Sequence, residues 1–375
     1  MAPRKDSLPH ETRTAAEPRQ NKLHTVRLAH IEQINRSVRL LRLSLTPEVP
    51  LGEDTSDEQI PPPEDFSFLP GQWLDVHIPG ISQAGGFTIT STPADAQPLP
   101  APDPTIIQDG TEQLLHQQGE FGVPSAGSDG RYPYVELAVQ DSPANPSAAW
   151  LWRPRAEILG KDLKVRVGGS FVWPPAALSM DRIRRVVFVA GGVGINPLIS
   201  ILSHLTEPKQ NSTVPLPDTS PKHPLNIDFL YTTRLPTNNK TSPQQHDGSI
   251  LEQILFLPRL RNIAQRLTNA NHPSNIKLTL NLFLTNTSSS SSSSSPPATD
   301  FLANSNNSRT IRVHNRRINK DDLNNATASQ RDGDGKSVAE DTVCYVCGPP
   351  PMTDEFVQYL ETLVGKERVL YEKWW

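Results

Sequence analysis

The stretch that decides the fold is Arg185-Val-Val-Phe-Val-Ala-Gly-Gly-Val-Gly-Ile-Asn-Pro197. Its continuous apolar part, residues 185–190, predicts a buried strand, and the pattern over 196–205 predicts a helix. Glycines between them let backbone amides approach a ligand, and the helix N-terminus adds a partial positive charge. The stretch therefore predicts a strand–loop–helix unit whose loop holds a pyrophosphate. A tight turn that needs small residues would explain the same glycines, because their spacing differs from the Gly-x-Gly-x-x-Gly fingerprint.

A second loop of this kind follows another apolar strand. Residues 342–346 read as a strand, Cys347-Gly-Pro-Pro-Pro-Met352 follows it, and residues 352–364 have a helical pattern. Ligands of open α/β sheets bind at the carboxyl edge of the strands, so both loops are expected at one edge. Cys344 and Cys347 should point to opposite faces of their strand, which disfavours a shared metal or a disulfide. Cys347 then faces either a substrate-binding cleft or ordinary packed interior.

The rest of the C-terminal half alternates strands and helices. Apolar segments over 227–231 and 278–284, with a helical pattern over 249–256 between them, predict a parallel α/β sheet. Segments rich in Ser, Asn, Thr, Pro and Asp interrupt this pattern, and they cannot bury enough apolar surface to fold. We expect disordered inserts at 207–224, 235–247, 285–310 and 319–340.

The N-terminal half reads as β-structure. Short strand-like segments separated by turn signals favour an antiparallel barrel or sandwich, and they occupy residues 24–32, 38–45, 71–78, 87–90, 134–139 and 163–167. Residues 1–22 are expected to form a disordered tail. The chain therefore divides into a β domain over 23–178 and an α/β domain over 179–375.

Composition limits the functions that this chain can have. A length of 375 residues is more than twice the usual domain of about 150 residues. A net charge of −4 gives no excess of positive charge for a nucleic-acid partner. The most apolar stretch, 186–202, contains glycine and proline and is shorter than the roughly 20 residues of a stable membrane span. Two cysteines suit a reducing, intracellular compartment, either mitochondrial or cytoplasmic.

Four motifs, in chain order, resemble the ferredoxin–NADP reductase superfamily. They are Gly71-Gln-Trp, Gly86-Phe-Thr-Ile-Thr-Ser-Thr-Pro93, Ala190-Gly-Gly-Val-Gly-Ile-Asn-Pro197 and Cys347-Gly-Pro-Pro-Pro-Met352. With the terminal Tyr371-Glu-Lys-Trp-Trp375, the chain looks like the subgroup of oxidoreductase NAD-binding domain-containing proteins. The resemblance implies the fold class β-barrel plus α/β: an antiparallel flavin-binding barrel, then a parallel-sheet nucleotide-binding domain. It also implies FAD and either NAD or NADP as cofactors.

The resemblance implies a flavin site on the barrel. The family motif Arg-x-Tyr-Ser-x-x-Ser aligns on Gly85, Phe87, Thr88 and Ser91, with Gly86 inside it. Thr88 would hydrogen-bond the flavin near its reactive nitrogen, Phe87 would pack on it, and Ser91 would support the loop. Gly85 replaces an arginine whose contact with flavin phosphate is worth about 1.5–3 kcal/mol.

A second flavin contact is implied around Asn145-Pro-Ser-Ala-Ala-Trp-Leu-Trp152, which resembles the short helix that follows the barrel strand in the family. Ser147 would be the N-cap there, and the amides behind it would face the pyrophosphate. A plain capped helix is the alternative. At the C-terminus, Trp375 would stack on the flavin, or both terminal indoles would fill the groove between the domains.

The resemblance also implies a nicotinamide nucleotide site. Its pyrophosphate loop would consist of Gly191, Gly192, Val193, Gly194, Ile195, Asn196 and Pro197. Its nicotinamide pocket would be lined by Cys347, Gly348, Pro349 and Met352. The catalytic residues of the whole protein would be Thr88 and Trp375, at the flavin, and Cys347, at the nicotinamide. Arg234 follows the second strand, where it would accept the 2′-phosphate of NADP or remain solvated.

Two hypotheses for function follow. In the first, the chain is a flavin-dependent oxidoreductase that passes hydride from NAD(P)H to FAD and electrons to an unknown acceptor. In the second, it is a nucleotide-binding scaffold of the same fold that has lost tight flavin binding. Its partners would be a nicotinamide nucleotide and an unidentified electron acceptor. No metal site is expected, because two cysteines are too few for an iron–sulfur cluster.

Overall fold

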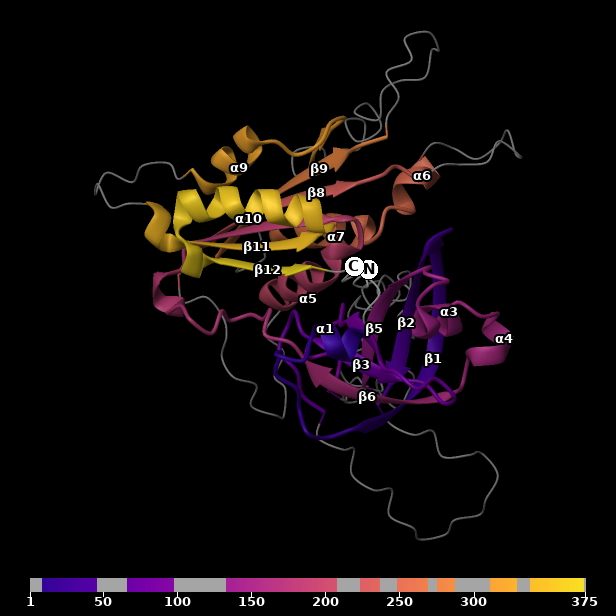
Figure 1. Ribbon diagram of the computed structural model, residues 1–375. Helices are drawn as coiled ribbons and strands as arrows, with labels where there is room; N and C mark the ends of the chain where they lie inside the picture. The colour runs from indigo at the N-terminus through magenta and orange to yellow at the C-terminus, as the bar shows by residue number, and fades with distance from the viewer. Residues whose placement is uncertain are drawn as a thin grey trace, which may run out of the picture.

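The computed structural model describes residues 9–45, 66–97, 133–207, 223–236, 248–268, 275–286, 311–328 and 338–373. The chain forms two halves that lie against each other, an N-terminal β half and a C-terminal α/β half (Figure 1). This is the fold class that the sequence and its resemblance predicted, and it is confirmed.

The N-terminal half is an antiparallel barrel. Its strands are β1 (His24–Asn35), β2 (Val38–Ser44), β3 (Trp73–His77), β4 (Gly85–Thr88), β5 (Tyr134–Gln140) and β6 (Asp162–Gly168), in the order β4-β3-β6-β1-β2-β5. A bridge between Ile89 and Leu137 brings the two edges of this sheet together and closes the barrel. The interior contains apolar side chains from every strand, among them Leu28, Leu41, Leu74, Val135, Val165 and Phe87. Two short helices, α3 (Pro146–Leu151) and α4 (Arg155–Ile158), connect β5 to β6.

The expectation of a disordered tail over residues 1–22 is wrong for the part that the structure describes. Helix α1 (His10–Arg13) packs against the outer wall of the barrel. The His10 ring meets the Trp73 ring edge-on, with centroids 4.6 Å apart. Gly86 makes this possible, because a Cβ at that position would overlap the His10 ring. A short apolar contact and ion pairs therefore order a segment whose composition alone indicated disorder.

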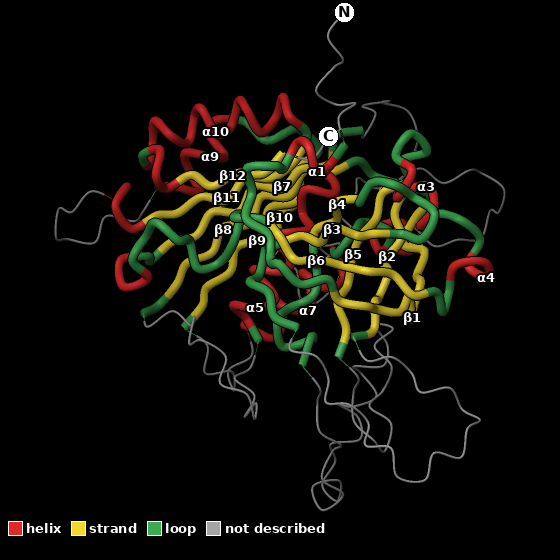
Figure 2. The backbone as a smooth tube through the Cα atoms, turned by 60° about the horizontal axis from the view of Figure 1, so that its bottom comes forward, coloured by secondary structure: helices red, strands yellow, loops and turns green. Residues whose placement is uncertain are grey.

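The C-terminal half is a parallel sheet in the order β10-β9-β8-β7-β11-β12. Its strands are β7 (Arg185–Gly191), β8 (Leu225–Thr233), β9 (Ile276–Leu284), β10 (Ile311–His314), β11 (Thr342–Gly348) and β12 (Val369–Lys373). Helices α5 (Ile195–Thr206), α6 (Gly248–Glu252) and α7 (Leu257–Thr268) share a core with the sheet face that meets the barrel. Helices α9 (Lys320–Thr327) and α10 (Pro350–Val364) cover the opposite face (Figure 2). Short 3-10 helices are η2 (Met180–Arg182), η3 (Gly192–Gly194), η4 (Val338–Asp341) and η5 (Lys366–Arg368).

The expected disordered insert at 319–340 is also corrected by the structure. Helix α9 lies inside it and begins with a capping box, in which the Asn319 and Asp322 side chains each bond the other's backbone N–H. Leu323 is fully buried in the core under α9 and α10. Most of the other predicted inserts lie outside the described residues. Among the described helices, none has both the length and the apolar character needed to cross a membrane.

Candidate nucleotide-binding site

The order of the parallel sheet reverses between β7 and β11. From β7 the chain builds β8, β9 and β10 to one side, then returns to add β11 and β12 on the other. In open α/β sheets such a switch point opens a crevice at the carboxyl ends of the strands, and ligands bind there. The two loops singled out in the sequence, after Gly191 and after Cys347, leave these two strands.

These two loops pack directly against each other. A Cβ on Gly194 would overlap the backbone carbonyl of Cys347, and a Cβ on Gly348 would overlap the Met352 side chain. A Cβ on Gly191 would lie 2.8 Å from both Met352 and Pro349. Gly194 is therefore needed because the Cys347 backbone lies against it, whereas Gly191 and Gly348 lie against side chains, chiefly that of Met352. Close packing between the two loops accounts for these three glycines without a ligand.

Gly192 differs from these three glycines. It has φ +56°, in the left-handed region, and no described atom lies within 4 Å of where its Cβ would be. Val193 beside it and Met352 across from it are partly exposed, and Pro349 is exposed. Helix α5 begins immediately afterwards, and no described side chain caps its N-terminus. Gly192 is thus the position where a phosphate could approach the backbone and the helix N-terminus.

The last three residues of the loop face inward. Ile195 and Pro197 are buried. Asn196 is 6 % exposed, and its Nδ2 donates a 3.0 Å hydrogen bond to the carbonyl of Ala138 on β5. Among the described residues, its Oδ1 has no hydrogen-bond partner. In this structure the segment from 195 to 197 attaches the loop to the barrel.

Cys347 is fully buried among the apolar residues that include Tyr345, Ile195 and Leu198. Burial raises the pKa of its thiol well above the usual range, and the Glu372 carboxylate adds to this rise. Cys344 belongs to the core on the other side of the sheet, as the strand periodicity predicted. Within the described residues, the Cys347 thiol is a packing group.

Arg234 lies just beyond the end of β8, and it is exposed. Thr232, two residues earlier, is the partner of Gly191 in the β7–β8 register. Arg234 therefore follows the strand next to the glycine loop at the same carboxyl edge, where the sequence placed it.

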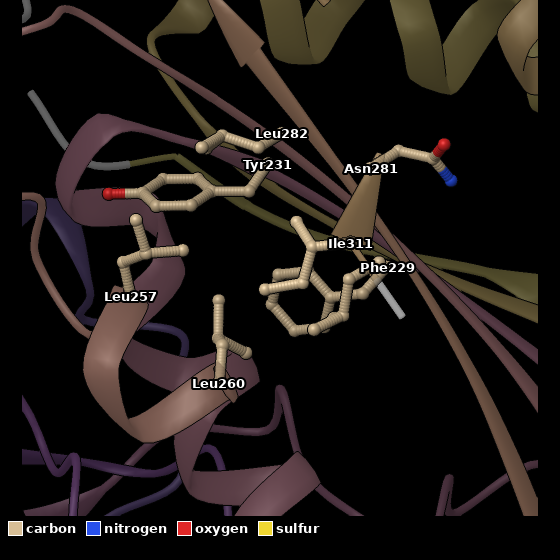
Figure 3. A pocket seen from close by; sticks show the side chains of 8 residues that line it. Phe229, Tyr231, Leu257, Leu260, Asn281, Leu282 and Ile311 are labelled. Carbon is tan, nitrogen blue, oxygen red and sulfur yellow. The ribbon is translucent and has the colours of Figure 1, made fainter. Parts of the chain in front are cut away.

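A small pocket lies elsewhere in this half, between α7 and the strands β8, β9 and β10 on one side of the sheet (Figure 3). Tyr231, Leu257, Leu260 and Ile311 line it, while the Asn281 side chain points away from it. It is part of the apolar core that α7 shares with the sheet, and no glycine of the two loops lines it. We do not assign the nucleotide to this pocket.

The diphosphate end of the predicted flavin site is filled by protein. A Cβ on Gly85 would lie 2.5 Å from Cβ of Ser147 and 2.6 Å from Cε2 of Phe87, so α3 rests on β4. The sequence predicted Ser147 as the N-cap of α3, and this prediction is wrong. Asn145 is the N-cap, and its Oδ1 accepts hydrogen bonds from the amides of Ser147 and Ala148 at 3.1 and 3.2 Å. A capping oxygen already occupies the place expected for phosphate.

The ring end of the predicted flavin site is also buried. Phe87 is 9 % exposed and packs in the barrel core, and Gly86 is covered by His10. The Ser91 hydroxyl accepts a 3.0 Å hydrogen bond from the Glu136 amide. Thr88 is buried, and no hydrogen bond to its hydroxyl is formed within the described part of the chain. Trp375 lies outside the described residues.

Sequence patterns gave no indication of a buried charge cluster between the two halves. Glu136 on β5 is 1 % exposed and pairs with Arg42 on β2 and, at 2.7 Å, with Arg259 on α7. Burial alone would raise the pKa of Glu136, but Arg259 and Arg42 outweigh it and lower that pKa. The Thr90 hydroxyl also donates to this carboxylate. The carboxylate thus links the C-terminal α/β half to the barrel.

A second charge cluster lies on the outer wall of the barrel. Glu11, Asp75 and His77 each bring a possible metal ligand within 4.8 Å of the other two. Arg19 and Arg166 already bond one oxygen of Asp75, at 2.9 and 2.7 Å. With two guanidinium groups beside the carboxylate, we assign the cluster to ion pairing.

Comparisons with known proteins agree with this architecture. No family model matches the chain. Human Oxidoreductase NAD-binding domain-containing protein 1 is 29% identical over 314 residues, 83% of this chain and 72% of that protein. The Danio rerio protein of the same name is 27% identical over 367 residues, 98% of this chain and 97% of that protein. Among solved structures, the CS-b5R domains of human Ncb5or in the NAD+ form align with a TM-score of 0.51 and 14% identity, covering 93% of this chain and 69% of that chain.

The barrel and the switch-point sheet define a protein with the ferredoxin–NADP reductase-like fold. More particularly, the chain is a homologue of the proteins named Oxidoreductase NAD-binding domain-containing protein 1. The resemblance read from the four motifs is confirmed.

Proposed function

We propose that this chain is an oxidoreductase that binds NADH or NADPH at the switch point and passes hydride from its nicotinamide to an acceptor. One observation carries the proposal. The two loops after β7 and β11 meet there and leave Gly192 open beside the N-terminus of α5. The name of the homologues and the NAD+ form of the Ncb5or structure support it.

The residues at this edge suit a dinucleotide. The backbone around Gly192 and Val193, with the partial positive charge of α5, would stabilise the diphosphate. Exposed Arg234 would pair with a 2′-phosphate, which would favour NADPH. A bound nicotinamide supplies the hydride. The buried wall of Tyr345 and Cys347 needs no titrating group for this transfer, because contact geometry and exclusion of water carry it.

The predicted route through FAD fits the chain less well. Gly85 offers no cation, Ser147 fills the space beside it, and Asn145 occupies the amides of α3. Within the described residues the Thr88 hydroxyl makes no hydrogen bond, and this feature suits a flavin ring. We therefore assign no step to FAD. The same contact of Gly85 with Ser147 favours the second candidate, a nucleotide-binding scaffold without redox turnover.

The test of the nucleotide site is Gly192→Asp, with Gly80→Asp as the matched control. Both glycines have positive φ and open space around them, and Gly80 lies in a turn of the barrel. Repulsion between the new carboxylate and the diphosphate should raise the Kd for NADH or NADPH, measured by calorimetry, about tenfold or more. Gly80→Asp should leave the Kd unchanged. Equal Kd values for the two variants would remove this loop from the site.

Turnover separates the two candidate functions. An oxidoreductase should oxidise NADH or NADPH in the presence of a two-electron acceptor such as a soluble quinone, which takes up the hydride and a proton to form the quinol, and Gly192→Asp should reduce that rate. A scaffold should bind the nucleotide and leave its absorbance at 340 nm, an optical property of any dihydronicotinamide, unchanged over the same period. Binding without oxidation would therefore reject the oxidoreductase and retain the scaffold.

A further inference from the structure

We propose that the barrel of this protein holds no FAD. The barrel surfaces that would face a flavin are packed instead against α3 on one side and against α5 and α7 on the other. Two separate regions of the barrel carry this inference. One is the contact between β4 and α3, and the other is the boundary with α5 and α7. Neither region depends on the nicotinamide site, so this inference can be tested independently of the proposed function.

The contact between β4 and α3 leaves no layer for a diphosphate. Ser147 is 2 % exposed, and its Cβ would be 2.5 Å from any Cβ added at Gly85. A real Cβ is essentially never found this close to another carbon, so the backbone at Gly85 and the Ser147 side chain already lie against each other with no room for a further group between them. Glycine at position 85 therefore does more than remove a positive charge. It allows the helix to occupy the space that an arginine and a phosphate would share.

The hydrogen-bond donors that would hold a phosphate there are also in use. The amides of Ser147 and Ala148 both donate to Oδ1 of Asn145, and the amide of Ala149 donates to its carbonyl at 2.8 Å. The first turn of α3 is thus satisfied by the chain itself. A diphosphate would have to displace the Asn145 side chain and move α3 away from β4.

The boundary with the nucleotide-binding half is closed by direct hydrogen bonds. Three side chains donate hydrogen bonds to backbone carbonyls of the barrel: Arg259 to Thr90 at 3.1 Å, Ser200 to Ser91 at 2.7 Å, and Asn196 to Ala138 at 3.0 Å. The Arg259 guanidinium also reaches the buried Glu136 carboxylate. These contacts tie α5 and α7 to the strand segments next to Thr88, where the resemblance implied a flavin ring between the halves.

The first experiment measures flavin in the full-length protein. The protein is purified, denatured, and assayed for released flavin, and the native protein is then titrated with FAD while flavin fluorescence is followed. We expect less than one flavin per ten chains and a Kd for FAD weaker than about 100 μM. A stoichiometric yellow protein, or a Kd below about 1 μM, would overturn the inference. NADH and NADPH are titrated into the same sample, so that loss of the nucleotide site is recognised separately.

Two variants distinguish a filled site from one that only lacks its arginine. If only the charge were missing, Gly85→Arg would strengthen FAD binding tenfold or more. We expect instead a lower melting temperature and no gain in FAD binding, because the arginine must push α3 off β4. Asn145→Ala frees two amides without adding bulk, and it remains testable if Gly85→Arg does not fold. It should leave FAD binding unchanged, and a tenfold gain in either variant would reject the inference.

Discussion

Among single residues, Asp75 brings one histidine and two arginines together on the barrel wall. Its side chain is fully buried, and its carboxylate contacts Nε2 of His10 at 3.1 Å, Nε of Arg19 at 2.9 Å and a terminal nitrogen of Arg166 at 2.7 Å. Arg19 also lies over the Trp73 ring, 4.8 Å from its centroid. Through these contacts, the Asp75 carboxylate on β3 binds the segment before β1 and also pairs with strand β6.

Replacing this carboxylate should destabilise the fold. Asp75→Asn leaves Arg19 and Arg166 facing a neutral amide inside the wall, and loss of one partner of a buried ion pair costs about 3 kcal/mol. Asp162→Asn is the control, because its pair with Arg27 is exposed and should be worth less than about 1 kcal/mol. Urea unfolding measures both. Equal losses in the two variants would contradict the role given to Asp75.

The same residue predicts how stability depends on pH. Burial alone would raise the pKa of Asp75, but hydrogen bonds from His10, Arg19 and Arg166 outweigh it and hold that pKa well below its usual range. A carboxyl with a lowered pKa in the folded state stabilises the fold above its unfolded pKa of about 3.9 and loses this contribution below it. The difference in unfolding free energy between wild type and Asp75→Asn should be constant above about pH 5 and shrink below about pH 4. A difference that grows on acidification would be inconsistent with this sign.

Single residues also show where sequence reasoning stops. The position of the glycine loop between a buried strand and a helix predicts a ligand site, but only the structure separates Gly192, which is open, from Gly194, which is packed against Cys347. Both positions require a glycine, so the sequence alone does not show which glycine is open and which is packed. Ser147 was taken for a helix cap because it suits that position, whereas Asn145 holds it. A difference of two residues in a helix start lies below what local pattern resolves.

Whole elements were predicted best where they are long and apolar. Strands β7 and β11 and helix α10 lie close to their predicted ranges, because a buried parallel strand and an amphipathic helix have strong periodic signals. Helix α7 was not predicted, although its apolar residues recur at helical spacing. Strand β10 has four residues and depends on pairing with β9, a contact between distant segments that local patterns do not contain.

Helix α9 gives a prediction at the scale of one element. It lies in a segment expected to be disordered, and its capping box at Asn319 should be essential to it. Asn319→Ala should cost about 1 kcal/mol, measured by urea unfolding, because it removes the acceptor for the Asp322 amide. Asn325→Ala, at an exposed position of the same helix, should change stability by less than about 0.5 kcal/mol. If both substitutions had the same small effect, the cap would not be what orders α9.

At the scale of the whole molecule, the two halves share one apolar core. Val38, Leu40 and Ala138 of the barrel belong to the same cluster as Phe188 and Leu198 of the parallel sheet and α5. The overall order, barrel first and sheet second, was predicted from the change in periodicity along the chain. The way in which the halves meet could not be predicted, because Glu136 and Arg259 lie 123 positions apart and neither has a local signature.

The link between the halves can be tested through Arg259. Arg259→Ala leaves Glu136 buried with Arg42 as its remaining arginine partner, and we expect a loss of about 3 kcal/mol of unfolding free energy. Arg261→Ala, on the same helix, breaks a partly exposed pair with Glu252 and should cost less than about 1 kcal/mol. Calorimetry should show the Arg259→Ala transition broadening or separating into two. A sharp transition at the wild-type temperature would contradict a coupling role for this arginine.

The placement of His10 has a practical consequence for anyone who produces this protein. A shortened gene that begins at the first barrel strand would encode every strand, yet it would omit the ring that covers Gly86 and the guanidinium that shields Trp73. The Trp73 indole would then be exposed to solvent, and this exposed apolar surface would make the shortened protein prone to aggregate. An affinity tag at the amino end therefore needs a spacer that leaves the first turn of α1 free to reach the barrel.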